Sequence, residues 1–469
     1  MFLGRENELK ELNRLYGNKG FQFIIIYGRR RVGKTALIAE FVKDKEHVFY
    51  ISIERNDKEA LADFSAQILN YFPLAKSMLD VFPSWDKAFA YIAEQAGKQS
   101  FILAIDEYPY LASGNPSISS ILQKYIDTSF QSTNMTLILC GSSMNFMKNQ
   151  VLGYKSPLYG RRTAQLEITP FDYYDAGSFF PQASLTDKML AYAVCGGIPQ
   201  YLNAVAQHGS VQEGIYECFF KKSGALYEEP ENLLKQELRE PAVYNTLIAS
   251  IAGGSSKLND ISTKTGEENK KCAKYLKSLM DLQIIHREQP HGIKKERNGI
   301  YALSDNMFRF WYRFIPKNVT GIEMGLGKQV LAERVMPEIT AHTGRVFEDA
   351  CRDYMKRMNK NQCLPFTFYD IGRWWGTNVN TKSQEEIDFI ADADEKAIFG
   401  ECKWQNAEVR LDVLQNLQRK SAIFSGYTDK HYFIFSKSGF HGLLKGDSAD
   451  GHVHLVDLGM MYGGGDGLQ

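Results

Sequence analysis

The sequence has no excess of either charge. Its 469 residues carry 55 lysines and arginines against 55 aspartates and glutamates, so the formal net charge at pH 7 is zero. This balance excludes a chain-wide basic surface, and any DNA-binding surface has to be a local patch. Apolar residues make up 44% and charged residues 23%, which is typical of a globular protein. At ~100–200 residues per domain, the length predicts about three or four domains.

Long apolar runs and paired cysteines are also missing. No stretch approaches the ~18 apolar residues of a membrane span. The opening residues, MFLGRENELKELNRLY, are charged almost at once, so we expect no signal peptide. The seven cysteines are odd in number and show no CxxC spacing. These absences predict reduced thiols, no membrane contact and a cytoplasmic location.

A phosphate-binding loop follows the first strand-like run. QFIIIY is β-branched and apolar, GRRRVGKT comes next, and ALIAEFVKD has helical spacing. Strand, GxxxxGK[ST] and helix in this order predict an ATP site whose backbone N–H groups face the phosphates. Lys34 would reach the β- and γ-phosphates, and the Thr35 hydroxyl would ligate Mg²⁺. The expected nucleotide-binding residues of the loop are Gly28, Arg29, Arg30, Arg31, Val32, Gly33, Lys34 and Thr35.

Two further strand-like runs end in polar residues. FILAIDEYPY is apolar up to Asp106 and Glu107. Asp106 would hold Mg²⁺ through water, and Glu107 would orient or activate the attacking water, because phosphoryl transfer depends on positioning and charge neutralisation. MTLILCGSS would deliver Ser142 and Ser143 to the crevice at the carboxyl ends of parallel strands. Either serine could sense the γ-phosphate or simply begin a loop.

Six motifs in order carry a resemblance to a known family: GRENEL, GRRRVGKT, LAIDEYPYL, LILCGSS, LYGRR and CGGIPQYL. Together they resemble the AAA-related ATPases first noted as an archaeal ATPase group, which are close to the STAND signal-transduction NTPases. The resemblance implies a P-loop ATPase core over residues 1–170 and a helical lid over 171–228. It also implies that the GRE segment lies near the adenine and that Pro199 of the lid faces the nucleotide.

Two arginines follow the third strand-like run. Arg161 and Arg162 could supply positive charge to a phosphate, either within the same chain or on a neighbouring one. AAA-like relatives often form rings or dimers in which an arginine acts on the neighbour's nucleotide, so a homo-oligomer stays an open alternative.

The middle of the chain predicts a winged helix-turn-helix over residues 229–315. YNTLIASIA, LNDISTKTG and ENKKCAKYLKSLMDLQII read as three helices, and the last runs into an alternating ribbon with a basic tip. Such a module can enter a DNA groove, or serve only for packing with a solvated lysine face. The lysines that would contact DNA are Lys270, Lys271, Lys274, Lys294 and Lys295.

Residues 316–333, which contain GIEMGLGK, read as a linker, and residues 330–469 predict a further α/β domain. An amphipathic helix (GRVFEDACRDYMKRM) precedes three strands, FTFYDIGRWWG, EEIDFIADAD and AIFGECKW. A helix and a strand, KHYFIFSK, follow. This is the core order of the restriction-endonuclease-like fold, and the resemblance implies a PD-(D/E)XK nuclease-like domain in which Ile387 replaces the usual proline.

Four residues of this domain could form a metal-dependent site. Side chains alternate along a strand, so Glu401 and Lys403 share a face, while Asp388 lies on the neighbouring strand. Asp388 and Glu401 would bind Mg²⁺, Glu348 could complete the ligand set, and Lys403 could orient water or stabilise phosphate. The alternative is a nuclease-like domain kept for binding or assembly.

The overall prediction is an α/β protein with a P-loop parallel-sheet core, a helical lid, a winged helix and a restriction-endonuclease-like domain. The leading functional hypothesis is a Mg-ATP-hydrolysing enzyme that acts on DNA and cuts it at the C-terminal site. Two alternatives stay open. One is a nucleotide-gated switch of the STAND type, and the other is a transcriptional regulator with an inert C-terminal domain.

Overall fold

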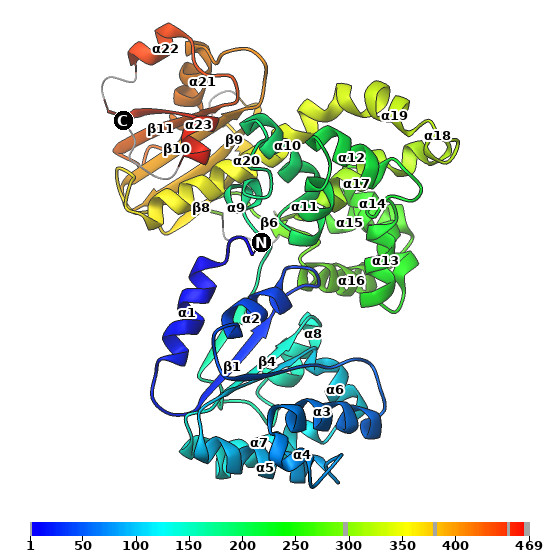
Figure 1. Cartoon of the computed structure of the whole chain (residues 1–469). Coiled ribbons are helices and arrows are strands. Elements are labelled where there is room, and N and C mark those ends of the chain that lie inside the picture. Colours follow the sequence, from blue (N-terminus) through cyan, green and yellow to red (C-terminus); the bar gives the residue numbers. More distant parts are fainter. Residues whose placement is uncertain (1, 294–298, 379–381, 448–450, 464–469) are drawn as a thin grey trace. The chain divides into compact units, whose positions relative to one another are not determined.

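The computed structural model describes residues 2–293, 299–378, 382–447 and 451–463 (Figure 1). The chain forms two compact units, residues 1–170 and residues 171–469. Over the described ranges, none of the helices combines the length and the apolar character that a membrane span requires. The finer boundaries expected within the second unit stay predictions.

The first unit is built on a parallel five-stranded sheet in the order β2-β3-β4-β1-β5. Its strands are β1 (Gln22–Tyr27), β2 (His47–Ile51), β3 (Ile102–Asp106), β4 (Thr136–Gly141) and β5 (Ala164–Glu167). Every residue of β1, β3 and β4 is buried, as expected for central strands covered on both faces. This confirms the predicted P-loop type of α/β core.

Helices connect these strands and supply the rest of the core. Apolar residues of the helices and strands pack into one continuous cluster that includes Phe64, Phe89 and Leu122. The helices are α1 (Glu6–Tyr16), α2 (Lys34–Val42), α3 (Asp57–Tyr71), α4 (Pro73–Lys76), α5 (Trp85–Lys98), α6 (Tyr108–Gly114), α7 (Ile118–Thr128) and α8 (Met144–Phe146).

The second unit begins with helices and a winged-helix arrangement. Helix α16 leads into an antiparallel ribbon of β6 (Ile285–Glu288) and β7 (Ile300–Leu303). Three helices followed by this ribbon confirm the predicted module. The helices up to this point are α9 (Tyr173–Gly177), α10 (Leu185–Cys195), α11 (Pro199–Ala206), α12 (Val211–Phe219), α13 (Glu229–Glu237), α14 (Pro241–Ala252), α15 (Leu258–Thr265) and α16 (Asn269–Asp281).

The expected linker at 316–333 is wrong. After α17 (Asn306–Phe314), the chain forms successive helical turns that include α18 (Val319–Glu323) and α19 (Gly327–Val330). A Cβ atom at Gly327 would lie 1.9 Å from the carbonyl oxygen of Phe220, so this segment packs tightly on the residue that follows α12. Gly327, one of the glycines that suggested a loose connection, instead permits close backbone contact.

The C-terminal part is a five-stranded sheet in the order β12-β11-β10-β9-β8. Strands β8 to β10 form an antiparallel meander, and β10, β11 and β12 run parallel. The predicted order of helix, meander, helix and strand is confirmed, whereas β12 and the helices around it were not predicted. The elements are α20 (Met336–Lys360), β8 (Asp370–Thr377), β9 (Gln384–Ala393), β10 (Lys396–Lys403), α21 (Leu411–Ser421), β11 (Asp429–Ser436), α22 (Gly442–Asp447), β12 (Val453–Asp457) and α23 (Leu458–Tyr462).

Two helices cover opposite faces of this sheet. Tyr354 of α20 packs edge-on against Phe435, which pairs in register with Cys402. Leu417 of α21 packs in the cluster that contains Phe399. Because side chains alternate along β10, Cys402 faces α20, while Phe399, Glu401 and Lys403 face α21.

Candidate functional site

The phosphate loop between β1 and α2 packs closely against the residue that follows β5, and its lysine hydrogen-bonds to the loop's own backbone. A Cβ atom at Gly28 would lie 2.3 Å from the carbonyl oxygen of Ile168, so only glycine fits there. The ammonium of Lys34 donates to the carbonyl oxygens of Gly28 at 2.9 Å and Arg29 at 3.0 Å. Gly33, with φ of 90°, ends the loop as the N-cap of α2. The loop and helix N-terminus have the geometry that anion binding requires.

Arg5 of the GRE motif braces this loop. Its buried guanidinium donates to the carbonyl oxygen of Val32 at 3.0 Å and to that of Thr169 at 2.6 Å, and it pairs with Glu8 at 3.1 Å. The family resemblance implied only that this segment lies near the adenine. The structure shows that Arg5 joins the phosphate loop to the segment after β5 through hydrogen bonds, which the sequence did not reveal.

A chain of hydrogen bonds joins the ends of three neighbouring elements. The Thr35 hydroxyl donates to Asp106 Oδ2 at 2.5 Å, and Asp106 Oδ1 accepts the backbone N–H of Glu107 at 2.8 Å. Glu107 Oε2 in turn accepts the Ser142 hydroxyl at 2.8 Å and the Ser142 N–H at 3.2 Å. The Thr35 hydroxyl and the buried Asp106 carboxylate together offer the oxygen donors that Mg²⁺ prefers.

The two arginines before β5 occupy different positions. Arg161 forms a two-pronged ion pair with Asp127, the Nε and Nη2 atoms each 2.7 Å from a carboxylate oxygen. Asp127 lies near the end of α7, and Arg161 precedes β5, so the pair lies toward the amino ends of the strands. This position argues against a contact of Arg161 with phosphate in the same chain. Arg162 lies near Tyr27, where burial and Glu167 raise the tyrosine pKa to about 12 and the Arg162 charge opposes the rise.

Pro199 begins helix α11 of the second unit, and its expected role toward the nucleotide stays a prediction. The preceding glycines have a local explanation. Gly196 has φ of 64°, and a Cβ atom at Gly197 would lie 1.8 Å from the carbonyl oxygen of Phe171. The Gly-Gly-Ile-Pro motif therefore permits a close backbone contact within the second unit before a new helix starts.

Helix α16 presents its lysines to solvent. Lys270, Lys271 and Lys274 are exposed, whereas Cys272 and Tyr275 of the same helix are buried. Lys271 pairs with the Glu267 carboxylate at 3.1 Å, which reduces its availability to another anion. The two predicted wing lysines, Lys294 and Lys295, lie outside the described residues.

In the C-terminal sheet, Asp388 lies at a β-bulge in strand β9. Only Arg373 separates Gly372 from Trp374 in β8, while two residues, Asp388 and Phe389, lie between their partners in β9. Asp388 Oδ2 accepts the backbone N–H of Cys402 on β10 at 2.7 Å.

The partly exposed carboxyl of Asp388 has a shifted pKa. Burial, then the charges of Glu401 and Glu348, raise the pKa of Asp388 to about 7. The four predicted site residues therefore lie together, and the three acids among them form an unfavourable concentration of negative charge.

Glu401 lies on the sheet face that α21 covers, between two lysines. Its buried carboxylate lies 2.6 Å from the Lys403 ammonium and 3.3 Å from the Lys420 ammonium. Burial lowers the pKa of Lys403, but the adjacent Glu401 carboxylate outweighs this effect and the net shift is upward. Lys420, on α21, was missed because only the packing of that helix brings it to the sheet.

A closer group of acids differs from the predicted one. Single carboxylate oxygens of Glu348, Glu386 and Asp388 lie within 4.8 Å of one another, which is a spacing that a divalent cation could bridge. Glu348 is ion-paired with Arg345, and Glu386 with Arg373. Glu386 was missed although the run EEID places it two residues before Asp388.

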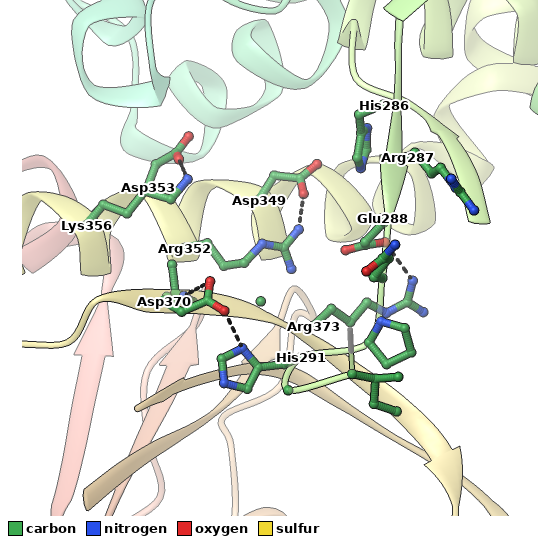
Figure 2. Close-up of a pocket in the computed structure, with 16 residues that line it drawn as sticks. His286, Arg287, Glu288, His291, Asp349, Arg352, Asp353, Lys356, Asp370 and Arg373 are labelled. Atoms are coloured by element: carbon green, nitrogen blue, oxygen red, sulfur yellow. Dashed lines mark hydrogen bonds and ion pairs between the residues drawn. The ribbon is translucent and has the colours of Figure 1, made fainter. Parts of the chain in front are cut away.

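A pocket of about 530 Å³ is lined by Arg352 and Arg373, each of which also contacts one of these acidic residues (Figure 2). Arg352 donates to the carbonyl oxygen of Asp388 at 3.0 Å, and Arg373 extends to Glu386. The pocket does not favour an anion, because its basic and acidic side chains balance. They come from β6 and the segment after it, α20 and β8, and they are Arg287, Arg352, Lys356 and Arg373 against Glu288, Asp349, Asp353 and Asp370.

Comparison with known proteins agrees with this geometry. Residues 2–205 match an ATPase domain found predominantly in Archaea, and residues 311–418 match archaeal and bacterial proteins of unknown function. An uncharacterized protein of Methanocaldococcus jannaschii is 33% identical over 444 residues, which cover 93% of this chain and 96% of the relative. The chain belongs to this archaeal ATPase family.

Two further similar proteins are described as an ATP-binding protein and an ATPase. An uncharacterized ATP-binding protein of Methanocaldococcus jannaschii is 48% identical over 46 residues, which cover 10% of this chain and 78% of the relative. Among solved structures, a Walker-type ATPase of Pyrococcus abyssi aligns with a TM-score of 0.51 at 19% identity and covers 66% of this chain and 96% of its own. That likeness supports the fold.

The raised pKa of Asp388 predicts a pH-dependent stability. An unfolded aspartate titrates near pH ~3.9 and the folded one near 7, so between these values the unfolded chain releases a proton that the folded chain keeps. Stability therefore falls as pH rises through this window. Three pKa units correspond to ~4 kcal/mol, which partial exposure reduces to about 1–2 kcal/mol.

We expect Asp388→Asn, assayed in chelator, to unfold at a higher temperature than the parent at pH 8 and at the same temperature at pH 4. The matched control is Asp412→Asn, an exposed acid on α21. Parallel pH profiles of the parent and Asp388→Asn would contradict the assignment.

Proposed function

We propose that this chain is a Mg-ATP-hydrolysing ATPase that acts on DNA and cuts it at a divalent-metal site in its C-terminal sheet. The observation that carries the ATPase proposal is the hydrogen-bond chain from Thr35 through Asp106 and Glu107 to Ser142. It gathers a metal ligand, a water-orienting carboxylate and a hydroxyl sensor at one edge of the sheet.

The roles in ATP hydrolysis follow from the positions. Thr35 and Asp106 would hold Mg²⁺, which neutralises phosphate charge when bound. Lys34 is held by loop carbonyl oxygens, which it can exchange for phosphate oxygens. Glu107 orients the attacking water and accepts its proton, and Ser142 sets the direction of the Glu107 carboxylate.

The C-terminal site would act on a phosphodiester. Glu348, Glu386 and Asp388, whose carboxylate oxygens lie within 4.8 Å of one another, would hold a divalent cation, which supplies Lewis acidity when bound. We expect Glu401, beside Asp388, to complete the ligand set. Lys403 lies beside them with a raised pKa and stays protonated at neutral pH, so it can stabilise phosphate charge. The exposed α16 lysines would bring DNA to the chain through phosphate contacts.

A second candidate function has its own observation. Glu401 is already neutralised by two lysines, and Glu348 and Glu386 are each paired with an arginine. Ion-paired carboxylates of this kind can persist as a structural element without a metal. This observation favours a nucleotide-gated switch or DNA-binding regulator whose C-terminal domain does not cut.

The ATPase proposal predicts separable effects of two variants. Lys34→Ala is expected to lose ATP binding, because the loop loses its charge for the phosphates. Glu107→Gln should keep binding but release phosphate about 100-fold or more slowly, since it cannot accept the proton. Ser142→Ala should slow hydrolysis, while the neighbouring Ser143→Ala serves as the control. Equal turnover by Glu107→Gln and the parent would contradict the role given to Glu107.

The DNA proposal predicts a graded salt effect. Reversing two α16 charges, Lys270→Glu with Lys274→Glu, should weaken DNA binding and reduce the slope of log affinity against log salt by about two. Fluorescence anisotropy at several salt concentrations measures both quantities. Lys235→Glu, an exposed lysine on α13, is the control. An unchanged slope would exclude α16 as the contact surface.

The nuclease proposal predicts cleavage that depends on the acids. With Mg²⁺ or Mn²⁺ and plasmid DNA, in the presence and absence of ATP, the parent should nick DNA. Asp388→Ala and Lys403→Ala should not, because each removes a charge from the site. Lys437→Ala, which follows β11 and bonds Asn406, controls for loss of a lysine. A parent that binds DNA and hydrolyses ATP but never cuts would favour the regulatory candidate.

A further inference from the structure

A second group of metal-ligating side chains lies at the other end of the C-terminal sheet. Strand β11 opens with Asp429 and His431, and His452 immediately precedes β12. Tyr432 pairs with Val453 in the parallel register, so His431 and His452 lie side by side. Residues two apart share a strand face, which adds Asp429 to the same surface.

The three side chains have the spacing of one coordination site. His431 Nε2 lies 3.2 Å from Asp429 Oδ1, and His452 Nδ1 lies 3.9 Å from the same oxygen. One ligand atom from each residue lies within 4.8 Å of the others. Tetrahedral zinc, with bonds of about 2.0–2.1 Å, separates its ligand atoms by about 3.4 Å. One ion therefore fits with small side-chain movements.

Further contacts orient these ligands. His454 Nε2 lies 3.4 Å from His431 Nδ1, so a proton shared there would direct the Nε2 lone pair of His431 toward Asp429. The second oxygen of Asp429 lies 3.7 Å from the Lys396 ammonium, which leaves Oδ1 directed at the histidines. Outer partners of this kind fix the orientation of metal-binding imidazole and carboxylate groups.

The donor set distinguishes this group from the acids around Asp388. Two imidazoles and one carboxylate suit zinc, cobalt or nickel, whereas carboxylates alone suit magnesium or calcium. Glu401 pairs with Ile434, five positions further along the parallel strands than Asp429. At ~3.3 Å per residue, the two groups are about 16 Å apart.

We propose that Asp429, His431 and His452 bind one first-row transition metal ion of the zinc class, with a fourth position open to water. The ion would join β11 to β12, which is the edge strand of the sheet. A metal that cross-links an edge strand stabilises the folded state by mass action. This inference stands apart from the ATPase and nuclease proposals.

The test uses the full-length protein, stripped with chelator and titrated with Co²⁺ in excess Mg²⁺. The parent should bind one Co²⁺ with the intense visible absorption of a tetrahedral site, and Zn²⁺ should displace it. His431→Ala and His452→Ala should lose this absorption. His441→Ala, a histidine outside the cluster, and Asp388→Ala should keep it. Absence of the spectrum in the parent, or its persistence in His452→Ala, would overturn the proposal.

A second measurement guards against a folding defect. His452 is 54% exposed, so its replacement should leave the sheet intact. Zn²⁺ should raise the unfolding temperature of the parent and of His441→Ala, but not that of His452→Ala. An equal rise in all three proteins would mean that zinc acts elsewhere and that the proposed site is wrong.

Discussion

The parallel pairing of β1, β3 and β4 is the constraint on which the first unit depends. Tyr27 pairs with Gly141, and β3 ends at Asp106 between its neighbours, so the next residue of each strand arrives at one edge. Backbone register thus brings the Thr35–Asp106 and Glu107–Ser142 contacts together. A site built on buried strand ends is held more firmly than one built on loops, and the loop that does contribute is braced by Arg5.

The second unit is organised around buried charge. The strand pairing and the bulge bring Asp388 next to Glu401. Two neighbouring negative charges oppose folding unless they are compensated. The structure compensates each acid differently: Glu401 with Lys403 and Lys420, and Asp388 with a proton near neutral pH. Removing one partner from such a group leaves an unpaired charge, which is far more costly than replacing the whole group.

The sequence could predict features that depend on residues close together along the chain, but not those that depend on residues far apart in the chain. The phosphate loop, the strand that ends in Asp106 and the C-terminal meander depend on neighbours along the chain, and their patterns were sufficient. Arg5, Arg161 and Lys420 find their partners through tertiary packing, so no local pattern shows those partners. The segment 316–333 was misread because it forms helical turns and its Gly327 serves close packing and not a loop. Pairing of β11 with β12 was equally invisible, and it alone assembles the histidine cluster.

The compensation around Asp388 also determines how a cation could enter. The ion pairs of Arg345 with Glu348 and of Arg373 with Glu386 would have to open before a divalent ion could bind. The remaining obstacle is the proton on Asp388, and a pKa of about 7 makes its release nearly free at neutral pH. The same carboxyl can therefore give up its proton to a competing metal ion at little cost in free energy. A site built only for stability would gain nothing from that balance, because a neutral asparagine would serve it better.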